Sequence, residues 1–152
     1  MVTKWEKKVK SGKKWEEMFL GEFRHSVDDR NRLALPKKIR IEISGNTLVL
    51  ARGFEKCILA YTRSDWERET AKELEAPISD SKGREIKRYL FSGAELVEID
   101  KVGRVLLPQL LKEYAEIGSE AVVIGAGDHF EIWNPRSWKN YLGEREKKIG
   151  KT

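Results

Sequence analysis

The fold of this chain is decided by a nine-residue stretch that occurs twice. Asp28-Asp29-Arg30-Asn31-Arg32-Leu33-Ala34-Leu35-Pro36 returns 72 positions later as Asp100-Lys101-Val102-Gly103-Arg104-Val105-Leu106-Leu107-Pro108. Both copies read Asp-x-x-x-Arg, then two apolar residues, then Leu-Pro. An internal repeat of this kind predicts a chain built from two copies of one structural unit.

The sequence around each copy extends the repeat. The sequence of each unit predicts the same order of elements along the chain. A strand, a tight turn and a second strand come first, followed by a short helix with Pro at its first position, two strands joined by a hairpin, and a further helix. The short helices are expected over residues 37–43 and 109–117, the hairpin strands over 48–51, 57–61, 121–124 and 130–133, and the last helices near Trp66 and Trp138. Ser64 and Ser137 are expected to cap those last helices.

The predicted organisation has five parts. They are a basic N-terminal extension (1–17), a first repeat (18–76), a linker with a connecting helix over Arg84–Phe91 (77–93), a second repeat (94–142) and a basic C-terminal tail (143–152). About 60 residues of short strands and helices make a marginal core. We therefore expect the two copies to share one core or to exchange strands.

The distribution of charge is more informative than its total. The chain of 152 residues has 30 Lys and Arg against 25 Asp and Glu, a net charge of +5. Residues 1–17 and 139–152 carry +3 each, which leaves −1 between them, so both basic ends could be solvated tails. Within the middle, residues 24–40 carry +4 and the equivalent residues 96–112 carry +1. The first unit is therefore the better candidate to bind an anion such as DNA.

The turn residues have recognisable roles. Asn31 and Gly103 occupy the same repeat position and tolerate a left-handed backbone, which predicts a tight turn. Asp28 and Asp100 can accept backbone N–H groups and also reach the Arg four residues later. Either this Asp–Arg pair only pins the turn, or the Arg side chains bind phosphates or guanine edges with their planar donors; Arg32 and Arg104 are the residues concerned.

Several classes of function lack the residues they need. No run approaches the roughly 18 apolar residues of a membrane span, and the Lys-rich start lacks the apolar segment of a signal peptide. One cysteine, Cys57, cannot form an internal disulfide, and with only His25 and His129 beside it there is no spaced zinc motif. Cys57 lies in an apolar strand and is expected to be a buried, inert thiol. We expect no membrane partner, metal, cofactor or catalytic residue, hence no enzyme.

These motifs resemble the MraZ family of bacterial transcriptional regulators, which is related to AbrB-type DNA-binding domains. The resemblance covers about residues 18–142. It rests on the opening Met18-Phe19-Leu20-Gly21-Glu22-Phe23-Arg24-His25-Ser26-Val27-Asp28, the two Asp-x-x-x-Arg turns, Gly53-Phe54-Glu55, and Phe130-Glu131-Ile132-Trp133-Asn134.

The resemblance implies a β-rich α+β fold in which two pseudo-symmetric units form a double-split, swapped-hairpin β-barrel with attached helices. It also implies a cytoplasmic, nucleoid-associated protein that assembles into ring-like homo-oligomers. These rings would bind short direct repeats of double-stranded DNA in the promoter of the division and cell-wall gene cluster.

The family's DNA-contacting residues carry over onto Arg30 and Arg32, and the internal repeat extends a weaker expectation to Lys101 and Arg104. Local charge adds Arg24, Lys37 and Lys38. The alternative is that Lys37, Lys38 and Arg40 form only the solvated face of a short helix. We expect Asp28, Asn31, Asp100 and Gly103 to shape the turns.

Two features depart from the family pattern. The family typically has Gly where this chain has Asn31, and its members usually begin near Met18. Residues 1–17 are therefore either an extension or an upstream start assigned in error, and we do not expect Trp5 or Trp15 to belong to the core. A second functional class is an AbrB-fold protein-interaction or antitoxin-like module. Only residues 143–152 follow the last Tyr and Leu, which is too few to wrap a partner.

Overall fold

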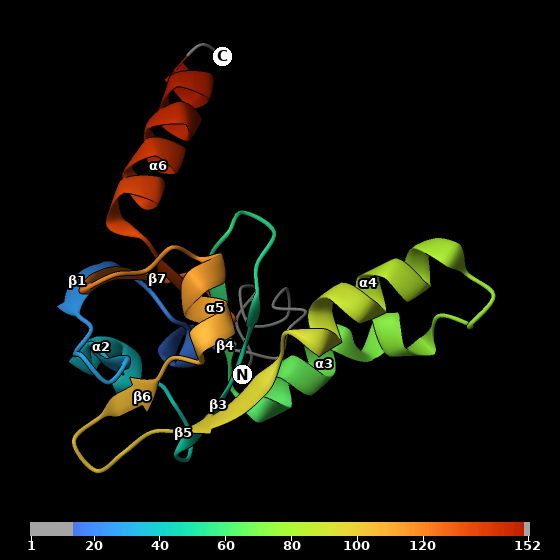
Figure 1. The fold of residues 1–152 in the computed structure, drawn as a ribbon, viewed down its shortest axis with the longest axis horizontal. Helices are drawn as coiled ribbons and strands as arrows, with labels where there is room; N and C mark the ends of the chain where they lie inside the picture. Colours follow the sequence, from blue (N-terminus) through green and yellow to red (C-terminus); the bar gives the residue numbers. More distant parts are fainter. Residues whose placement is uncertain (1–13, 151–152) are drawn as a thin grey trace, which may run out of the picture.

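The order of helices and strands follows the repeat. A computed structural model describes residues 14–150 (Figure 1). The first unit contains β1 (Glu22–Ser26), β2 (Arg32–Ala34), α2 (Lys37–Arg40), β3 (Thr47–Arg52), β4 (Ile58–Tyr61) and α3 (Arg63–Glu75). The second contains β5 (Glu95–Glu98), β6 (Arg104–Leu106), α5 (Gln109–Tyr114), β7 (Glu120–Gly125), β8 (Phe130–Trp133) and α6 (Pro135–Gly150). The short 3-10 helix η1 (Trp15–Glu17) comes first, and α4 (Ser81–Ser92) connects the units. The predicted connecting helix is confirmed.

The two units exchange strands throughout one antiparallel sheet. Its order is β1-β7-β8-β4-β3-β5, so β1 and β4 of the first unit pair with β7 and β8 of the second, and β5 of the second pairs with β3 of the first. A separate two-stranded ribbon pairs β2 with β6, with Leu33 opposite Val105. The expectation of exchanged strands is confirmed.

Each Asp-x-x-x-Arg turn joins the sheet to the ribbon. Isolated bridges link Val27 to Leu33 in the first unit and Ile99 to Val105 in the second. The two turns therefore leave the opposite edge strands of the sheet, β1 and β5, and enter the paired strands β2 and β6. This brings two turns that are 72 residues apart in sequence onto one ribbon.

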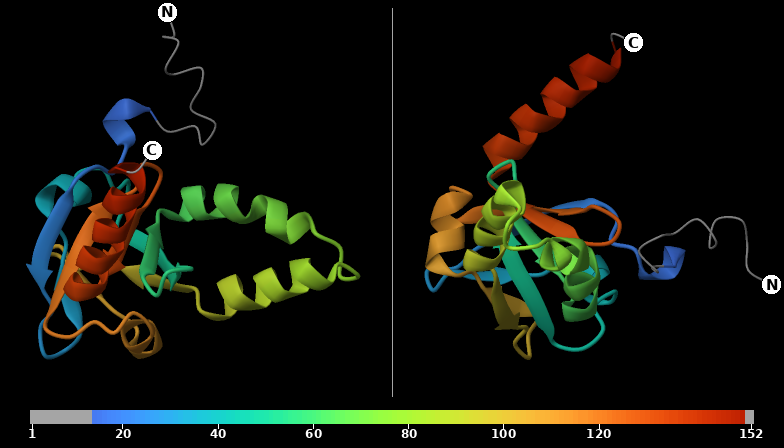
Figure 2. Two further views of the ribbon diagram at one scale, coloured as in Figure 1. Left: turned by 90° about the horizontal axis from the view of Figure 1, so that it is seen from above. Right: turned by 90° about the vertical axis from the view of Figure 1, so that its right-hand side faces the viewer.

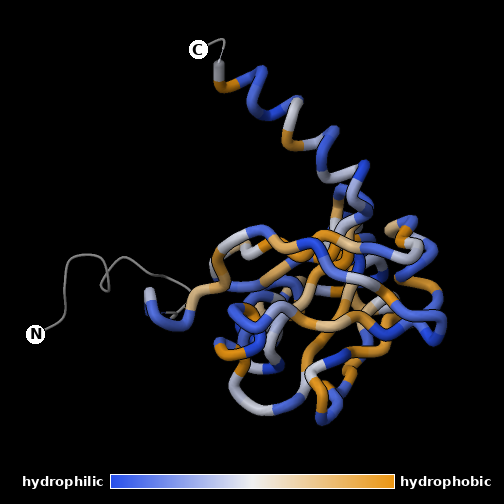
Figure 3. The backbone as a smooth tube through the Cα atoms, turned by 90° about the vertical axis from the view of Figure 1, so that its left-hand side faces the viewer, coloured by the Kyte–Doolittle hydropathy of each residue, from blue (hydrophilic) through white to orange (hydrophobic). Residues whose placement is uncertain are grey.

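The main core lies between the sheet, the ribbon and the two short helices, and both units contribute to it. Its fully buried members include Leu33 and Ile39 from the first unit and Val105 and Ile132 from the second. In Figure 3 the hydrophobic colours gather in this body, whereas most of α6 is hydrophilic. Because the core is shared, neither unit buries its apolar face alone.

The helices outside the core differ between the two units. Helices α3 and α4 lie side by side as a hairpin that projects from the strands (Figure 2), whereas α6 leaves the body in another direction. Near its start, α6 packs through Trp138 and Tyr141 on Trp133, which belongs to a second, smaller apolar cluster.

The predicted helix caps and Pro positions are wrong by a few residues. Thr62, not Ser64, caps α3, since its Oγ1 accepts the backbone N–H of Asp65 at 3.3 Å. At the start of α6, Asn134 Oδ1 accepts the backbone N–H groups of Arg136 and Ser137 at 2.8 and 3.1 Å, so Ser137 lies inside the helix. Both capping residues, Thr62 and Asn134, directly follow a strand. Pro36 and Pro108 likewise occupy the position before α2 and α5, not the first helical residue.

The predicted extension lies mainly outside the described residues, as does Trp5. Trp15 is 57% exposed, which confirms that it does not belong to the core, whereas Phe19 is fully buried. At the other end, α6 continues through residues 143–150 of the predicted tail. Along residues 14–150, no helix combines the length and apolar character that crossing a membrane requires.

Candidate nucleic-acid interface

The first turn is held together by the carboxylate of Asp28. Asp28 Oδ1 accepts the backbone N–H groups of Arg30 and Arg32 at 3.0 and 2.9 Å, and Oδ2 accepts from Arg32 Nε at 2.8 Å. Asn31 has a φ of 62°, the left-handed conformation expected from its repeat position. One carboxylate thus fixes both the backbone of the turn and the direction of the Arg32 side chain.

The second turn repeats this geometry closely. Asp100 Oδ1 accepts the backbone N–H groups of Val102 and Arg104 at 3.0 and 2.8 Å, and Oδ2 accepts from Arg104 Nε at 2.9 Å. Gly103 has a φ of 84°. The structural role predicted for Asp28, Asn31, Asp100 and Gly103 agrees with this geometry.

Both turn carboxylates are held in the charged form. The backbone hydrogen bond from Arg32 is the main cause that lowers the pKa of Asp28, and the Arg32 side chain adds to it against the effect of desolvation. The equivalent bonds from Arg104 lower the pKa of Asp100. Because an ionised carboxylate only accepts hydrogen bonds, a lowered pKa keeps each turn in its bonded form.

Arg32 and Arg104 therefore stabilise their own turns. Their side chains are 30% and 33% exposed, and each directs Nε inward to its own Asp. Arg104 Nη1 also lies 4.0 Å from Asp28 Oδ2, so the charged groups of the two turns adjoin. Both predicted contributions of Arg32, to the turn and to an anion, can coexist because a guanidinium has five N–H donors and Nε uses one of them.

The residues at the tips of the turns are exposed and differ in chemistry. Arg30 lies at the tip of the first turn, where the second has Val102, which is 65% exposed. The position before the tip is Asp29 in the first turn and Lys101 in the second, and both are exposed. The predicted residues Arg30 and Lys101 are thus accessible to a large ligand, but they do not occupy equivalent positions.

The two predicted lysines begin helix α2, which follows strand β2 after Leu35 and Pro36. Lys37 and Lys38 are exposed. The next residue, Ile39, is fully buried. This burial pattern fixes the helix against the core and directs both lysines to solvent. Arg40, the third cation of this helix, is exposed as well, and its guanidinium lies against Gly103 of the second turn.

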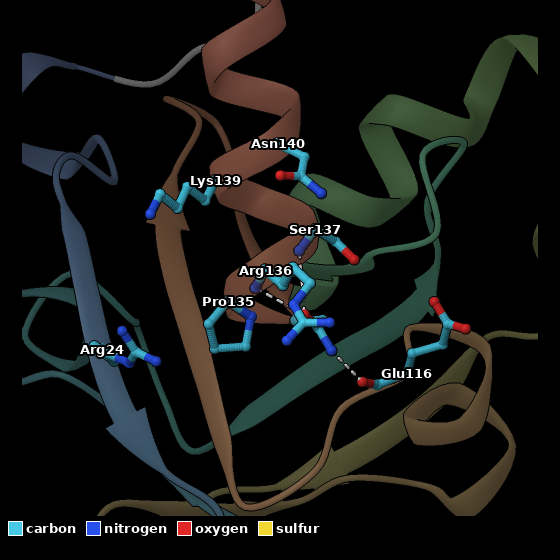
Figure 4. A pocket seen from close by; sticks show the side chains of 8 residues that line it. Arg24, Glu116, Pro135, Arg136, Ser137, Lys139 and Asn140 are labelled. Carbon is cyan, nitrogen blue, oxygen red and sulfur yellow. Dashed lines mark hydrogen bonds between the residues drawn. The ribbon is translucent and has the colours of Figure 1, made fainter.

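Arg24 is placed apart from the turns. It lies on β1, and its Nε donates to Glu120 of β7 at 2.8 Å; both side chains are mostly exposed. Arg24 lines an open hollow of about 880 Å³ together with Arg136 and Lys139 of α6, whose side chains Figure 4 shows. Arg24 therefore borders a different surface from Arg30, although the sequence put both in one basic window.

Three residues at the turns were missed by the prediction of interface residues. Gln109 and Lys112 of α5 contact Asn31 of the first turn, and Arg40 of α2 contacts Gly103 of the second. The repeat shows that Arg40 and Lys112 occupy equivalent positions, because they are 72 residues apart. The sequence alone, however, does not indicate that either residue contacts a turn.

The thiol and histidine side chains that could suggest catalysis or metal binding are not part of the turns. Cys57 is buried, as predicted, and burial raises the pKa of its thiol, which keeps it protonated and a poor nucleophile. His129 contacts Asp128 at 2.7 Å and Glu131 at 2.9 Å. Burial alone would lower its pKa, but these two carboxylates outweigh burial and raise it to about 9. Residues 14–150 contain no group of three or more His, Cys, Asp or Glu side chains suited to a metal ion.

A family model described as "MraZ protein, putative antitoxin-like" matches the chain twice, at residues 18–89 and 90–151. The two matches divide the chain as the repeat does, with one Asp-x-x-x-Arg turn in each.

Curated relatives match across most of the chain. A protein named transcriptional regulator MraZ from Roseiflexus castenholzii is 44% identical over 125 residues, covering 82% of this chain and 87% of the relative. Proteins of the same name from Dictyoglomus thermophilum and Halothermothrix orenii are 42% and 37% identical, covering 84% and 85% of this chain and 86% and 90% of the relatives.

Proposed function

Because the chain belongs to the MraZ family, we propose that it regulates transcription by binding double-stranded DNA in a sequence-specific manner. The proposed target is a set of short direct repeats in the promoter of the division and cell-wall gene cluster. The proposed chemistry is binding, without catalysis, and takes place on the nucleoid in the cytoplasm. The names of the relatives support the regulatory role.

The first turn is the observation that carries this proposal. It presents the exposed guanidinium of Arg30 from a backbone fixed by Asp28, and exposed Lys37 and Lys38 begin the next helix. A planar guanidinium suits guanine edges and phosphates, and lysines suit phosphates as point charges. We assign base or phosphate contact to Arg30, phosphate contact to Lys37 and Lys38, and weaker roles to Arg32, Lys101, Arg104 and Arg24.

One such turn would bind weakly, because the window around it carries only +4. We propose that a ring-like homo-oligomer presents several copies of the turn to successive DNA repeats. Each further contact would then be intramolecular, which raises overall affinity through effective concentration. Direct repeats are the matching target because they present identical sites in one orientation.

The fold proposed for each subunit is a closed double-split barrel with swapped hairpins. The bridges from Val27 to Leu33 and from Ile99 to Val105 support closure, since they join the ribbon to the residues that directly follow the two edge strands, β1 and β5. We retain residues 18–76 and 94–142 as the two units and 77–93 as their connection.

A protein-interaction or antitoxin-like role is the second candidate. The description of the matching family model as antitoxin-like favours it, and α6 offers a helix with no buried residue along its length. An antitoxin of this kind would still use the turns for DNA, so the two candidates differ in whether a protein partner is also required.

Native mass spectrometry with and without promoter DNA tests both the DNA and the oligomer. We expect a ring of several subunits that takes up the repeat-containing duplex and not a duplex with scrambled repeats. A monomer that binds neither duplex would contradict the proposed function. Binding to promoter DNA only when a second protein is added would favour the antitoxin-like role.

A further inference from the structure

The first turn is held by the second unit as well as by its own Asp28. Three groups of Asn31 bond to the second unit: its backbone O accepts Leu107 N–H at 2.8 Å, its side-chain Nδ2 donates to Gln109 Oε1 at 3.0 Å, and its Oδ1 accepts from Lys112 Nζ at 2.6 Å. Gln109 is in turn fixed by Glu113, whose Oε1 accepts from Gln109 Nε2 at 2.9 Å.

The second turn is held reciprocally by the first unit. The backbone O of Gly103 accepts Leu35 N–H at 2.9 Å, which is the equivalent of the bond between Leu107 and Asn31. Arg40, the equivalent of Lys112, places its guanidinium where a side chain at Gly103 would begin. Each turn thus contacts a basic residue from the short helix of the other unit. Only in the first turn does a side chain, that of Asn31, form a hydrogen bond with this basic residue.

We propose that Gln109 and Lys112 are positioning residues of the first turn, which makes the DNA-reading surface a composite of both units. This inference rests on the proposed DNA binding. Asn31 immediately precedes Arg32 and follows Arg30, so fixing its backbone and side chain fixes the direction in which the tip leaves the protein. A left-handed residue stores backbone strain, which surrounding bonds must hold in place.

The geometry separates this role from direct contact with DNA. Lys112 is half-buried and directs its ammonium to Asn31 at 2.6 Å, whereas Lys37 and Lys38 are exposed. A lysine that neutralises a phosphate contributes to the dependence of affinity on salt, while a lysine that orients a loop does not. The slope of affinity against salt therefore distinguishes the two roles.

The test compares Lys112→Met with Lys38→Met, which makes the same change at a proposed phosphate contact. Fluorescence anisotropy would measure binding of the full chain to a labelled duplex of the division and cell-wall promoter at several salt concentrations. Loss of a charge-assisted hydrogen bond predicts about tenfold weaker binding for Lys112→Met, with the wild-type salt slope. Lys38→Met should reduce the slope by about 1 for each subunit engaged. Lys112→Arg, which restores a donor, should recover most of the affinity.

Wild-type affinity for Lys112→Met, or a slope reduced as in Lys38→Met, would overturn the positioning role. If Lys112→Met does not fold, Asn31→Gly replaces it, because Gly keeps the left-handed backbone and removes only the side chain that Gln109 and Lys112 hold.

A readout without DNA separates this inference from the proposed function. Amide hydrogen exchange at Arg30 and Arg32 should quicken in Lys112→Met while exchange in β7 and β8 stays unchanged. If the wild type binds no duplex but this exchange result is obtained, the proposed function fails and the positioning role stands. Unchanged exchange at both arginines would refute the positioning role itself.

Discussion

The first and second turns have nearly the same backbone and different surfaces. Asp28 and Asp100 make the same three hydrogen bonds, at distances that agree within about 0.1 Å. Their tips, however, are Arg30 in one and Val102 in the other. Position 24 on β1 is Arg and its equivalent is Leu96; position 38 on α2 is Lys and its equivalent is Leu110.

The difference indicates that the repeat conserves a scaffold and varies its exposed positions. Leu96, Val102 and Leu110 are 51%, 65% and 80% exposed, so burial does not explain why they are apolar. The equivalent residues of the first unit are all cationic. At these three positions the first unit thus offers cationic side chains and the second unit apolar ones, although Arg24 lies on a different surface from Arg30. The proposed DNA interface belongs to the first unit.

The largest contrast is expected between Arg30→Ala and Val102→Ala. Arg30→Ala should weaken binding to promoter DNA by about 1–3 kcal/mol for each contacting subunit, because it removes a base or phosphate contact. Val102→Ala, at the equivalent position, should bind as the wild type does. Mobility-shift titration checks the affinities, and equal losses in the two variants would remove the assignment of the first turn.

A smaller contrast concerns stability. Gly103→Ala places a Cβ on a left-handed residue and against the Arg40 guanidinium, which should lower the free energy of unfolding by about 1–2 kcal/mol with little change in DNA affinity. Gly45→Ala is the matched control, since Gly45 also has a positive φ, 86°, with open space around it. Urea unfolding should show a greater loss for Gly103→Ala; equal losses would mean that the Arg40 contact contributes nothing.

The two turn carboxylates should respond alike to acid. A carboxyl group whose pKa is lowered by folding stabilises the fold above its unfolded-state pKa, near 4, and loses that contribution as the pH falls through the folded-state pKa. Asp28→Asn and Asp100→Asn should each lower the Tm at pH 7, and their difference from the wild type should shrink below pH 4. Thermal unfolding across this range measures it. A difference that persists undiminished at low pH would contradict the role of the ionised carboxylates.

Titration of His129 is expected to have the smallest effect on the comparison of the two turns. It should change the stability of the whole fold and leave the relative DNA affinities of the turn variants unchanged. Folding raises its pKa from 6.5 to about 9, so its bonds to Asp128 and Glu131 stabilise the fold fully below pH 6.5 and are lost as the pH rises through 9. The wild type should lose more thermal stability than His129→Gln between pH 7 and pH 10. The relative affinities of Arg30→Ala and Val102→Ala should stay constant between pH 7 and pH 8, where His129 remains charged.

The repeat predicted the architecture well because each copy carries the pattern of its own strands and helices, and the presence of two copies indicates two equivalent units. Apolar alternation, turn residues and Leu-Pro appear in each copy, so the strands, short helices and shared core followed from one pattern. The helix caps were misplaced because a Ser near a predicted helix competes with Thr62 and Asn134, and only the backbone shows which side chain meets the free N–H groups.

The candidate site was predicted in part. Aspartates at fixed spacing implied their hydrogen bonds, but the sequence alone did not separate Arg32, which bonds within its turn, from Arg30, which is exposed. It also grouped Arg24 with the turn, whereas a strand places it beside Glu120. The contacts of Gln109 and Lys112 with Asn31 depend on strand exchange between units, which brings residues about 80 positions apart together.

Photo-crosslinking from the position before each tip tests the central comparison most directly. A benzophenone side chain would replace Asp29 in one variant and Lys101 in another, two exposed positions that are equivalent in the repeat. After irradiation with promoter duplex, we predict a high yield of crosslinked DNA from position 29 and a low yield from position 101. Equal yields, or a higher yield from position 101, would contradict the claim that the first turn is the one that reads DNA.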